Sequence, residues 1–161
     1  ALSIRAVARE AGVAAGLVGY YYEDKATLIR AALQRTGEQD LALLDPDPSV
    51  APEDQLREVI GRVARPEFLT TEYLSLRLHL WSLAQADEDF EAINTRAQAA
   101  YRAKLAQLIK AARPVLRRAE CARRAADVDV LQNGLWLTAL LGLDAASVKR
   151  CIARCEDIAL G

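Results

Sequence analysis

Residues 3–25 of this chain read SIRAVAREAGVAAGLVGYYYEDK, and their spacing is the strongest indication of the fold. Ser3 is placed to cap a short helix, because a serine oxygen accepts hydrogen bonds from the free N–H groups of a first turn. Gly12 is placed to end that helix, since glycine adopts the left-handed conformation at no steric cost. A second helix is expected over about residues 14–22, and Asp24 is placed to cap a third.

The spacing within this stretch is that of a helix-turn-helix. Ala8 is small at the point where the two helices are expected to cross, and Gly12 turns the chain four residues later. Val18, six residues after Gly12, packs the second helix against the first helix. In a helix-turn-helix the second helix lies in the major groove of DNA. The stretch therefore favours double-stranded DNA as a partner. Further apolar residues occupy the matching positions Ile4, Val7, Ala11 and Val13.

The rest of the chain also predicts helix, so the expected fold class is all-α. Proline and glycine are sparse, and apolar residues recur at helical spacing. Residues 45–52, DPDPSVAP, contain three prolines and predict a loop between helices. Residues 72–86 are apolar on almost every side, which predicts a central buried helix. Other helices are expected from Pro52 onward and over about residues 87–112, 118–141 and 144–160.

Composition limits the classes of function. The formal net charge is −1, so binding to DNA must come from a local surface. No apolar run approaches the length of a membrane span and the chain does not start with a signal segment, so we expect a cytoplasmic protein. The three cysteines, Cys121, Cys151 and Cys155, form no CxxC pair. We expect reduced structural thiols, no metal site and no cofactor.

Two segments carry a family resemblance. AREAGVAAGLVGYYYEDKATL, residues 8–28, resembles the DNA-binding segment of TetR/AcrR-type transcriptional repressors. NGLWLTALLGLDAASVKRCIARC, residues 133–155, resembles the last two helices of the BetI-like branch. The resemblance implies a homodimeric repressor that a small-molecule inducer releases from a palindromic operator. It also implies a DNA-binding domain with its connecting helix over residues 1–44, its first helix missing here, and a ligand-binding and dimerisation domain over residues 45–161.

The resemblance places phosphate contacts around the second helix. Tyr21 and Lys25 stand where the family binds phosphate, and Ser3 is placed for another such contact. The chemistry suits this role, because a phenol donates to a phosphate oxygen and an ammonium neutralises it. Lys25 also lies near a helix N-terminus, whose free N–H groups favour the same anion. Tyr22 matches a buried aromatic of the family, and Tyr20 is expected to flank the groove.

The positions that correspond to base contacts are chemically poor. Small apolar side chains can touch a thymine methyl group and little else, whereas an arginine can form a bidentate bond to guanine. Only Arg5 offers that bond, so we expect modest direct readout assisted by DNA shape. The full set of base-contacting positions implied by the resemblance is Arg5, Ala15, Gly16, Leu17 and Gly19.

An inducer cavity is expected between helices of the second domain. The candidates for its lining are Tyr73, His79 and Trp81 on the helix over residues 72–86, and Phe90, Asn94 and Tyr101 on the next. BetI-type relatives respond to choline, and Trp and Tyr rings can hold a quaternary ammonium by cation–π attraction. Spacing alone also fits ordinary core residues, for His79 as for the rings, so the ligand stays open.

The last two helices are the expected dimer interface. Gly134 lies in mid-helix, where a glycine costs about 1 kcal/mol against alanine and usually marks the close approach of another backbone. Val148, Ile152 and Cys155 form a seam near heptad spacing that fits a partner helix or an ordinary core. The expected interface residues are Leu131, Gly134, Leu135, Thr138, Val148, Ile152 and Cys155.

Two other classes of function compete with the repressor. An all-helical enzyme is disfavoured, because the chain has no HExxH, no nucleophile elbow and no phosphate loop, and its single histidine leaves little for acid–base chemistry. We therefore expect no enzymatic activity. The alternative that stays open is a helical interaction or sensor protein that retains the fold but not specific DNA binding.

Overall fold

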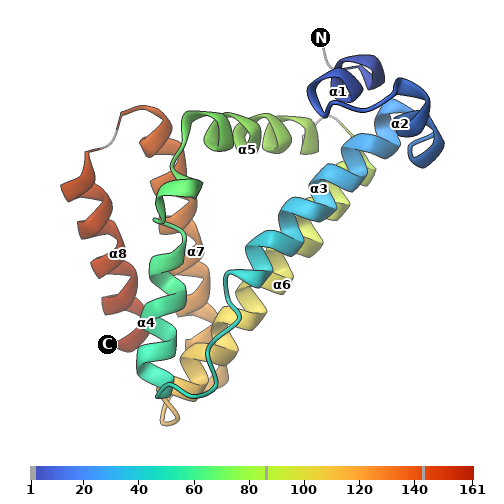
Figure 1. Cartoon of the computed structure of the whole chain (residues 1–161). Helices are drawn as coiled ribbons and strands as arrows, with labels where there is room; N and C mark the ends of the chain where they lie inside the picture. The colour runs from blue at the N-terminus through green and yellow to red at the C-terminus, as the bar shows by residue number, and fades with distance from the viewer. Residues whose placement is uncertain (1–2, 86, 143) are drawn as a thin grey trace.

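The computed structural model describes residues 3–85, 87–142 and 144–161. Every regular element in these ranges is a helix, which confirms the all-α fold class. Two short helices, α1 (Ile4–Glu10) and α2 (Ala15–Tyr21), project from one corner of a bundle of longer ones (Figure 1). The bundle elements are α3 (Lys25–Ala42), α4 (Pro52–Arg62), the 3-10 helix η1 (Pro66–Phe68), α5 (Thr71–Ala84), α6 (Glu88–Ala112), α7 (Arg118–Leu140) and α8 (Ala145–Leu160).

The predicted helix ends near the start of the chain are confirmed. The Oγ of Ser3 accepts a hydrogen bond from the backbone N–H of Ala6 at 3.2 Å, as an N-cap does. Gly12 has φ of +66°, the left-handed conformation expected after a helix. The Oδ1 of Asp24 accepts from the N–H of Thr27 at 2.7 Å and caps α3. Local sequence therefore accounts for the start of α1, the turn after it and the start of α3.

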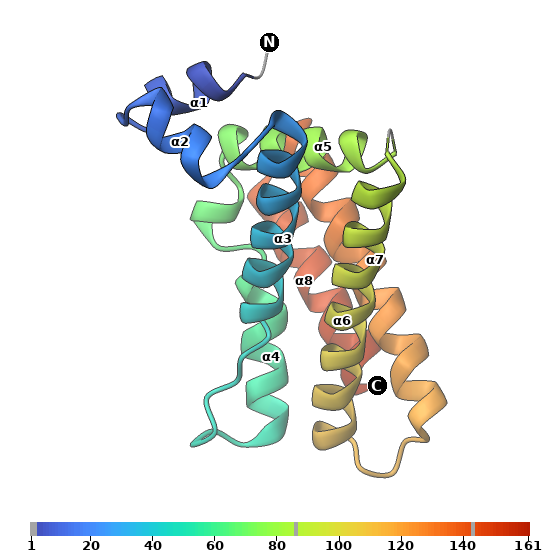
Figure 2. The same cartoon turned by 90° about the vertical axis from the view of Figure 1, so that its right-hand side faces the viewer.

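Helices α3 and α6 lie side by side along much of their length (Figures 1 and 2). Near their beginnings, Ile29 and Leu33 pack against Phe90 and Ile93 in one apolar cluster. Farther along, a Cβ built on Gly37 would lie 2.8 Å from the Cβ of Ala97, closer than real Cβ atoms come. The glycine at this position is therefore what lets the two backbones approach so closely.

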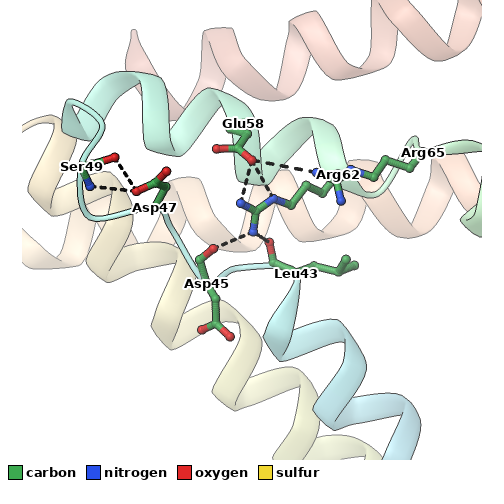
Figure 3. A network of polar contacts seen from close by, with 7 residues as sticks. All are labelled: Leu43, Asp45, Asp47, Ser49, Glu58, Arg62 and Arg65. Atoms are coloured by element: carbon green, nitrogen blue, oxygen red, sulfur yellow. Dashed lines mark hydrogen bonds and ion pairs between the residues drawn. The ribbon is translucent and has the colours of Figure 1, made fainter.

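The proline-containing segment between α3 and α4 forms the predicted loop, and Arg62 holds it in place (Figure 3). Nη1 of Arg62 donates to the backbone oxygens of Leu43 at 3.1 Å and Asp45 at 2.6 Å. Its Nη2 pairs with Glu58 one turn earlier on α4 at 2.8 Å. Lys104 of α6 donates to the oxygen of Leu41 at 3.2 Å. These contacts anchor the C-terminal end of α3 to the bundle.

The largest apolar cluster joins α4, α6, α7 and α8. Leu56, Ile60, Leu105 and Ile109 are fully buried in it, together with Cys155 of α8. Val148 and Ile152, farther up α8, pack against the same bundle. The seam that was expected to meet a partner helix therefore faces its own protomer, because α8 needs those side chains to cover α4 and α7.

The prediction that residues 72–86 form a central buried helix is wrong. Helix α5 lies across one end of the bundle and packs on one side only (Figure 1). It buries Leu74 and Leu80, whereas Leu76 is 53% and Leu78 is 43% exposed. Apolar residues on every side of a helix allow all its sides to be buried. Only the sides that meet a neighbouring helix become buried. Ala86, the last residue of the predicted range, lies outside the described residues.

We predict that Gly37→Ala destabilises the protein by about 1–3 kcal/mol, because the added methyl group forces α3 and α6 apart. Urea unfolding measures the loss. The matched control is Gly61→Ala in α4, where no described atom beyond the adjoining helix backbone lies within 4 Å of the added Cβ. This control is expected to leave stability unchanged or raise it by up to about 1 kcal/mol. Equal effects of the two substitutions would contradict the close approach.

Candidate nucleic-acid interface and inner cavity

Helices α1 and α2 form the predicted helix-turn-helix. Ala8 and Val18 are buried against each other's helix, as the spacing required. The backbone N–H of Val13 donates to the oxygen of Ala8 at 2.9 Å and closes the turn around Gly12. Only Val18 is buried among the residues of α2, so the rest of that helix is open to solvent. The arrangement presents one face of α2 at the projecting corner of the molecule (Figure 1).

All the residues predicted to contact DNA are exposed. Tyr20 and Tyr21 meet edge to face with ring centroids 5.3 Å apart, and both rings stand clear of the bundle. Tyr22 is half-buried, and its backbone N–H donates to the oxygen of Val18 at 2.8 Å. Exposure makes a contact possible and does not establish it, so these assignments stay predictions. The exposed set is Ser3, Arg5, Ala15, Gly16, Leu17, Gly19, Tyr20, Tyr21 and Lys25.

The N-terminus of α3 is less open to an anion than the sequence suggested. Lys25 is its first residue, but the carboxylate of Asp24 already caps the first turn. The hydrogen bond from the backbone of Thr27 lowers the pKa of Asp24, so that group is ionised at neutral pH. An ionised carboxylate repels phosphate. The phosphate contact expected of Lys25 therefore depends on its ammonium and not on the helix end.

A small cavity lies between α3, α5, α6 and α7. Its volume is about 50 Å³, which corresponds to room for roughly three to five water molecules. Three of the predicted lining residues, Trp81, Asn94 and Tyr101, do line it. The other lining residues are Leu33, Thr36, Gly37, Asp40, Arg77, Leu80, Ala97, Gln98, Asp129, Gln132, Asn133 and Trp136.

Three predicted pocket residues lie elsewhere. His79 is on the exposed side of α5, so it is neither a core residue nor part of the cavity. Phe90 is buried in the contact between α3 and α6, which is the ordinary core role that its spacing also allowed. Tyr73 lies behind the cavity wall, where its hydroxyl accepts a hydrogen bond from Arg77 at 3.2 Å. Tyr73 and His79 were misplaced because the side of α5 that faces the bundle does not follow from the periodicity of its apolar residues.

Arg77 is the central polar residue of the cavity and is only 5% exposed. Its Nη1 and Nη2 donate to the two carboxylate oxygens of Asp40, at 2.7 and 3.0 Å. The guanidinium carbon lies 3.7 Å from the ring centroid of Trp136 and 5.3 Å from that of Trp81. The rings that could have held a ligand cation therefore surround the protein's own cation.

Four polar side chains of the lining or next to it tie α6 to α7. The Nε of Arg102 donates to Asp129 at 2.6 Å, and Asn133 donates to the other oxygen of Asp129 at 3.1 Å. The hydroxyl of Tyr101 donates to Gln132 at 2.7 Å, and Gln132 in turn donates to the oxygen of Ile60 at 3.3 Å. The cavity wall is therefore a network of polar groups that are mostly paired.

Burial sets the protonation of this network. Burial raises the pKa of Asp40, and the nearby charge of Asp129 adds to the rise, against the opposing effect of Arg77. Burial, followed by the charges of Asp40 and Asp129, also raises the pKa of Tyr101, which stays a neutral phenol. The negative charges of Asp40 and Asp129 therefore both affect the protonation of groups around the cavity.

Sequence reasoning missed Arg77, Asp40, Asp129 and Gln132 as site residues. One signal was present, because Arg77 is the single arginine or lysine between Arg65 and Arg96 and lies within an otherwise apolar helix. A charge in such a place is buried with a partner or points to solvent, and periodicity does not distinguish the two. Its partner lies 37 residues away on α3, which no local pattern predicts.

We predict that Arg77→Met destabilises the protein by about 3–5 kcal/mol, because it leaves the buried carboxylate of Asp40 without a partner. The double substitution Asp40→Leu with Arg77→Met is expected to recover most of that loss, since it removes both charges. Urea unfolding of the four proteins of this cycle measures the coupling. The control is Arg57→Met, which breaks an exposed pair with Glu156 and is expected to cost at most about 1 kcal/mol. A double variant as unstable as the single one would contradict the pairing.

The described residues contain no group of three or more His, Cys, Asp or Glu side chains placed to hold a metal ion. Among the same residues, no helix combines the length and apolar character needed to span a bilayer. The three cysteines are free thiols, with Cys121 and Cys155 buried. Burial raises the pKa of Cys155 to about 12, so its thiol is protonated and unreactive at neutral pH.

Comparison with known proteins gives this geometry a family. Residues 52–159 match the C-terminal domain of the BetI-type transcriptional repressors, which covers more than half of the chain. No curated protein matches. The fold is similar to the crystal structure of a candidate transcriptional regulator from Pseudomonas aeruginosa PAO1, with a TM-score of 0.78 and 20% sequence identity, over 98% of this chain and 78% of that one. The chain belongs to the TetR family of transcriptional regulators, in its BetI-type branch.

Proposed function

We propose that this regulator is a homodimeric repressor that places α2 in the major groove of a palindromic operator and is released by a small molecule in the inner cavity. One observation carries the proposal. Helix α3 begins at Lys25, directly after the helix-turn-helix, and its second half lines the cavity with Leu33, Gly37 and Asp40. A single rigid element therefore joins the DNA-binding surface to the cavity. The protein acts on DNA in the cytoplasm and carries out no catalysis.

The chemistry of the exposed surface favours backbone contacts over base contacts. The phenol of Tyr21 and the ammonium of Lys25 are open to phosphate, with Ser3 on the neighbouring helix. Between Ala15 and Gly19 the surface of α2 is nearly bare, which allows a close approach to the groove floor but supplies few hydrogen bonds. Affinity then rests on phosphate contacts, and sequence preference on Arg5 and on DNA shape.

We predict that Lys25→Ala and Tyr21→Phe weaken binding to all DNA sequences alike, because phosphate contacts carry no sequence information. Lys25→Ala is expected to reduce the slope of log K against log salt by about 1. Arg5→Ala is expected to relax preference at a single base pair instead. The measurement is fluorescence anisotropy on an operator selected from genomic DNA, at several salt concentrations. The control is Lys149→Ala, an exposed lysine on α8 far from the helix-turn-helix.

The outcome for the wild-type protein separates the repressor from its alternative. If the wild type selects no DNA sequence from the genome, the helical sensor or interaction protein without specific DNA binding is the correct function. If Arg5→Ala weakens all sequences equally, the assignment of Arg5 as a base contact is wrong while the repressor stands.

The dimer surface that we propose differs in part from the one predicted. Leu135 and Cys155 are buried within the protomer, so they cannot meet a partner. On the outer face of α7, Val130 and Leu137 are 63% and 44% exposed, and Leu141, the residue that follows α7, is 79% exposed. Together with Gly134 they occupy residues 130, 134, 137 and 141, which is heptad spacing. Apart from the adjoining backbone of α7, no atom of the described residues lies within 4 Å of a Cβ at Gly134, so the close approach expected there is open to a partner helix.

Of the other predicted interface residues, three pack against the core of the protomer and one lies beside the exposed apolar stripe formed by residues 130, 134, 137 and 141. Leu131 packs partly against the core, as do Val148 and Ile152. Thr138 is exposed beside the stripe, and its hydroxyl donates to the oxygen of Gly134 at 2.7 Å. The outer stripe is therefore the better candidate, because it is the part of the last two helices with apolar side chains left uncovered.

We predict that Gly134→Leu and Leu141→Lys each convert the dimer to monomers, the first by blocking close helix approach and the second by placing a charge in the stripe. Sedimentation velocity measures the change. The control is Val115→Lys, which alters an equally exposed apolar residue in the loop before α7. A dimer unchanged by both stripe substitutions would eliminate this surface, and a monomeric wild type would eliminate the homodimer.

A further inference from the structure

The exposed stripe of residues 130, 134, 137 and 141 is too small to hold two copies of the chain together by itself. It offers three exposed apolar side chains and a glycine. A stable protein–protein interface buries roughly 800 Å² on each partner and involves about 20–30 residues a side. Surface next to the stripe must therefore contribute to the proposed dimer.

Exposed apolar residues of α5 are the available extension. Among the described residues, four of the exposed large apolar side chains lie in the helix-turn-helix, and Val115 lies in the loop at the far end of α7. Outside these and the stripe, Leu76 and Leu78 of α5 remain. Helix α5 lies across the end of the bundle at which α7 finishes (Figure 1). The extension of the stripe is therefore sought on α5.

A shallow recess between α5 and α7 distinguishes the two leucines. Leu78 and Leu137 both line this recess, whereas Leu76 does not. The two leucines of α5 are two positions apart, so their side chains point about 200° away from each other around the helix. Leu137 belongs to the stripe, so the recess joins Leu78 to it. The apolar surface of the stripe therefore continues onto α5 at Leu78.

The recess suits a protein surface better than a small ligand. Its volume is about 10 Å³, which is room for roughly one water molecule. Its lining consists of four leucines, two tryptophans and Arg77, which is buried and paired with Asp40. Covering the recess therefore removes apolar surface from water and takes no exposed charge out of water.

The recess and the inner cavity share a wall. Arg77, Trp81 and Trp136 line both spaces. Trp81 is half-buried in the protomer, and Trp136 is buried. A protein surface placed on the recess is therefore separated from the cavity by these three side chains.

We propose that the partner copy in the homodimer covers the recess between α5 and α7, with Leu78 as an interface residue, and so backs the tryptophan wall of the inner cavity. The occupant is a second copy of this chain, because the recess continues the stripe and a two-fold dimer uses the same patch on both copies. This inference rests on the homodimer of the proposed function and deepens it by naming the part of the cavity wall that the partner supports. It requires no DNA.

The first test compares the two leucines of α5. Sedimentation velocity over a dilution series of the full chain measures the dissociation constant of the dimer for the wild type, Leu78→Lys and Leu76→Lys. We expect Leu78→Lys to raise this constant at least about tenfold, because it places an ammonium against apolar surface of the partner. Leu76→Lys is the matched control on the same helix and is expected to stay within about twofold of the wild type. Equal effects of the two substitutions, or no effect of Leu78→Lys, overturn the proposal.

The second test uses the wild type and does not depend on the folding of a variant. Trp81 and Trp136 are the two tryptophans of the chain, so its tryptophan fluorescence reports on the shared wall alone. Quenching of this fluorescence by acrylamide is measured above and below the dissociation constant of the dimer. We expect a lower quenching constant in the dimer, because the partner shields Trp81. A quenching constant that dissociation leaves unchanged overturns the proposal.

Failure of this inference is distinguishable from failure of the proposed function. A wild type that is monomeric at every concentration eliminates the homodimer and this inference with it. A dimer that Leu141→Lys dissociates, but that Leu78→Lys leaves intact, refutes the covered recess alone. Selection of an operator by the wild type tests the repressor separately, because that measurement does not involve Leu78.

Discussion

The buried guanidinium of Arg77 fixes the inner faces of three helices. It projects from α5, pairs with Asp40 of α3 through two hydrogen bonds and stacks on Trp136 of α7. The indole N–H of Trp136 donates in turn to the oxygen of Val63 at the end of α4, at 3.0 Å. A cation in a dry interior is stable only with such partners, so the positions of these helices follow from keeping Arg77 paired. The cavity is the space that this arrangement leaves.

The same constraint relates the small cavity to the helix that leads to the proposed DNA-binding surface. Helix α3 is continuous from the helix-turn-helix to Asp40, and its far end is fixed by Lys104 and Arg62. Gly37 holds it close to α6 in between. Under the proposed function, a ligand that changes the pairing of Arg77 acts on α3 between the end fixed by Arg62 and Lys104 and the end that packs against α6.

The sequence predicted the helix-turn-helix well and the inner cavity only in part. The helix-turn-helix follows from Ala8, Gly12 and Val18, because the contacts that define it span about ten residues. The cavity residues Trp81, Asn94 and Tyr101 were found by type and helical position, whereas His79 and Phe90 were misplaced by the same criteria. Which side of α5 faces inward depends on α3 and α7, and neither is near α5 in sequence. The pairing of Arg77 with Asp40 was therefore not accessible to any local pattern.

Local sequence was enough to predict the long helices, the caps at Ser3 and Asp24 and the loop at residues 45–52, since these depend on backbone conformation and on hydrogen bonds between residues a few positions apart. It also determined that α7 and α8 carry apolar seams. Only the tertiary structure decided that the seam of α8 covers its own bundle and that the uncovered stripe lies on α7, around Gly134. The physical reason is that burial belongs to pairs of surfaces. The sequence shows which side chains are apolar, and the packing of the whole chain determines which of them are buried within the protomer.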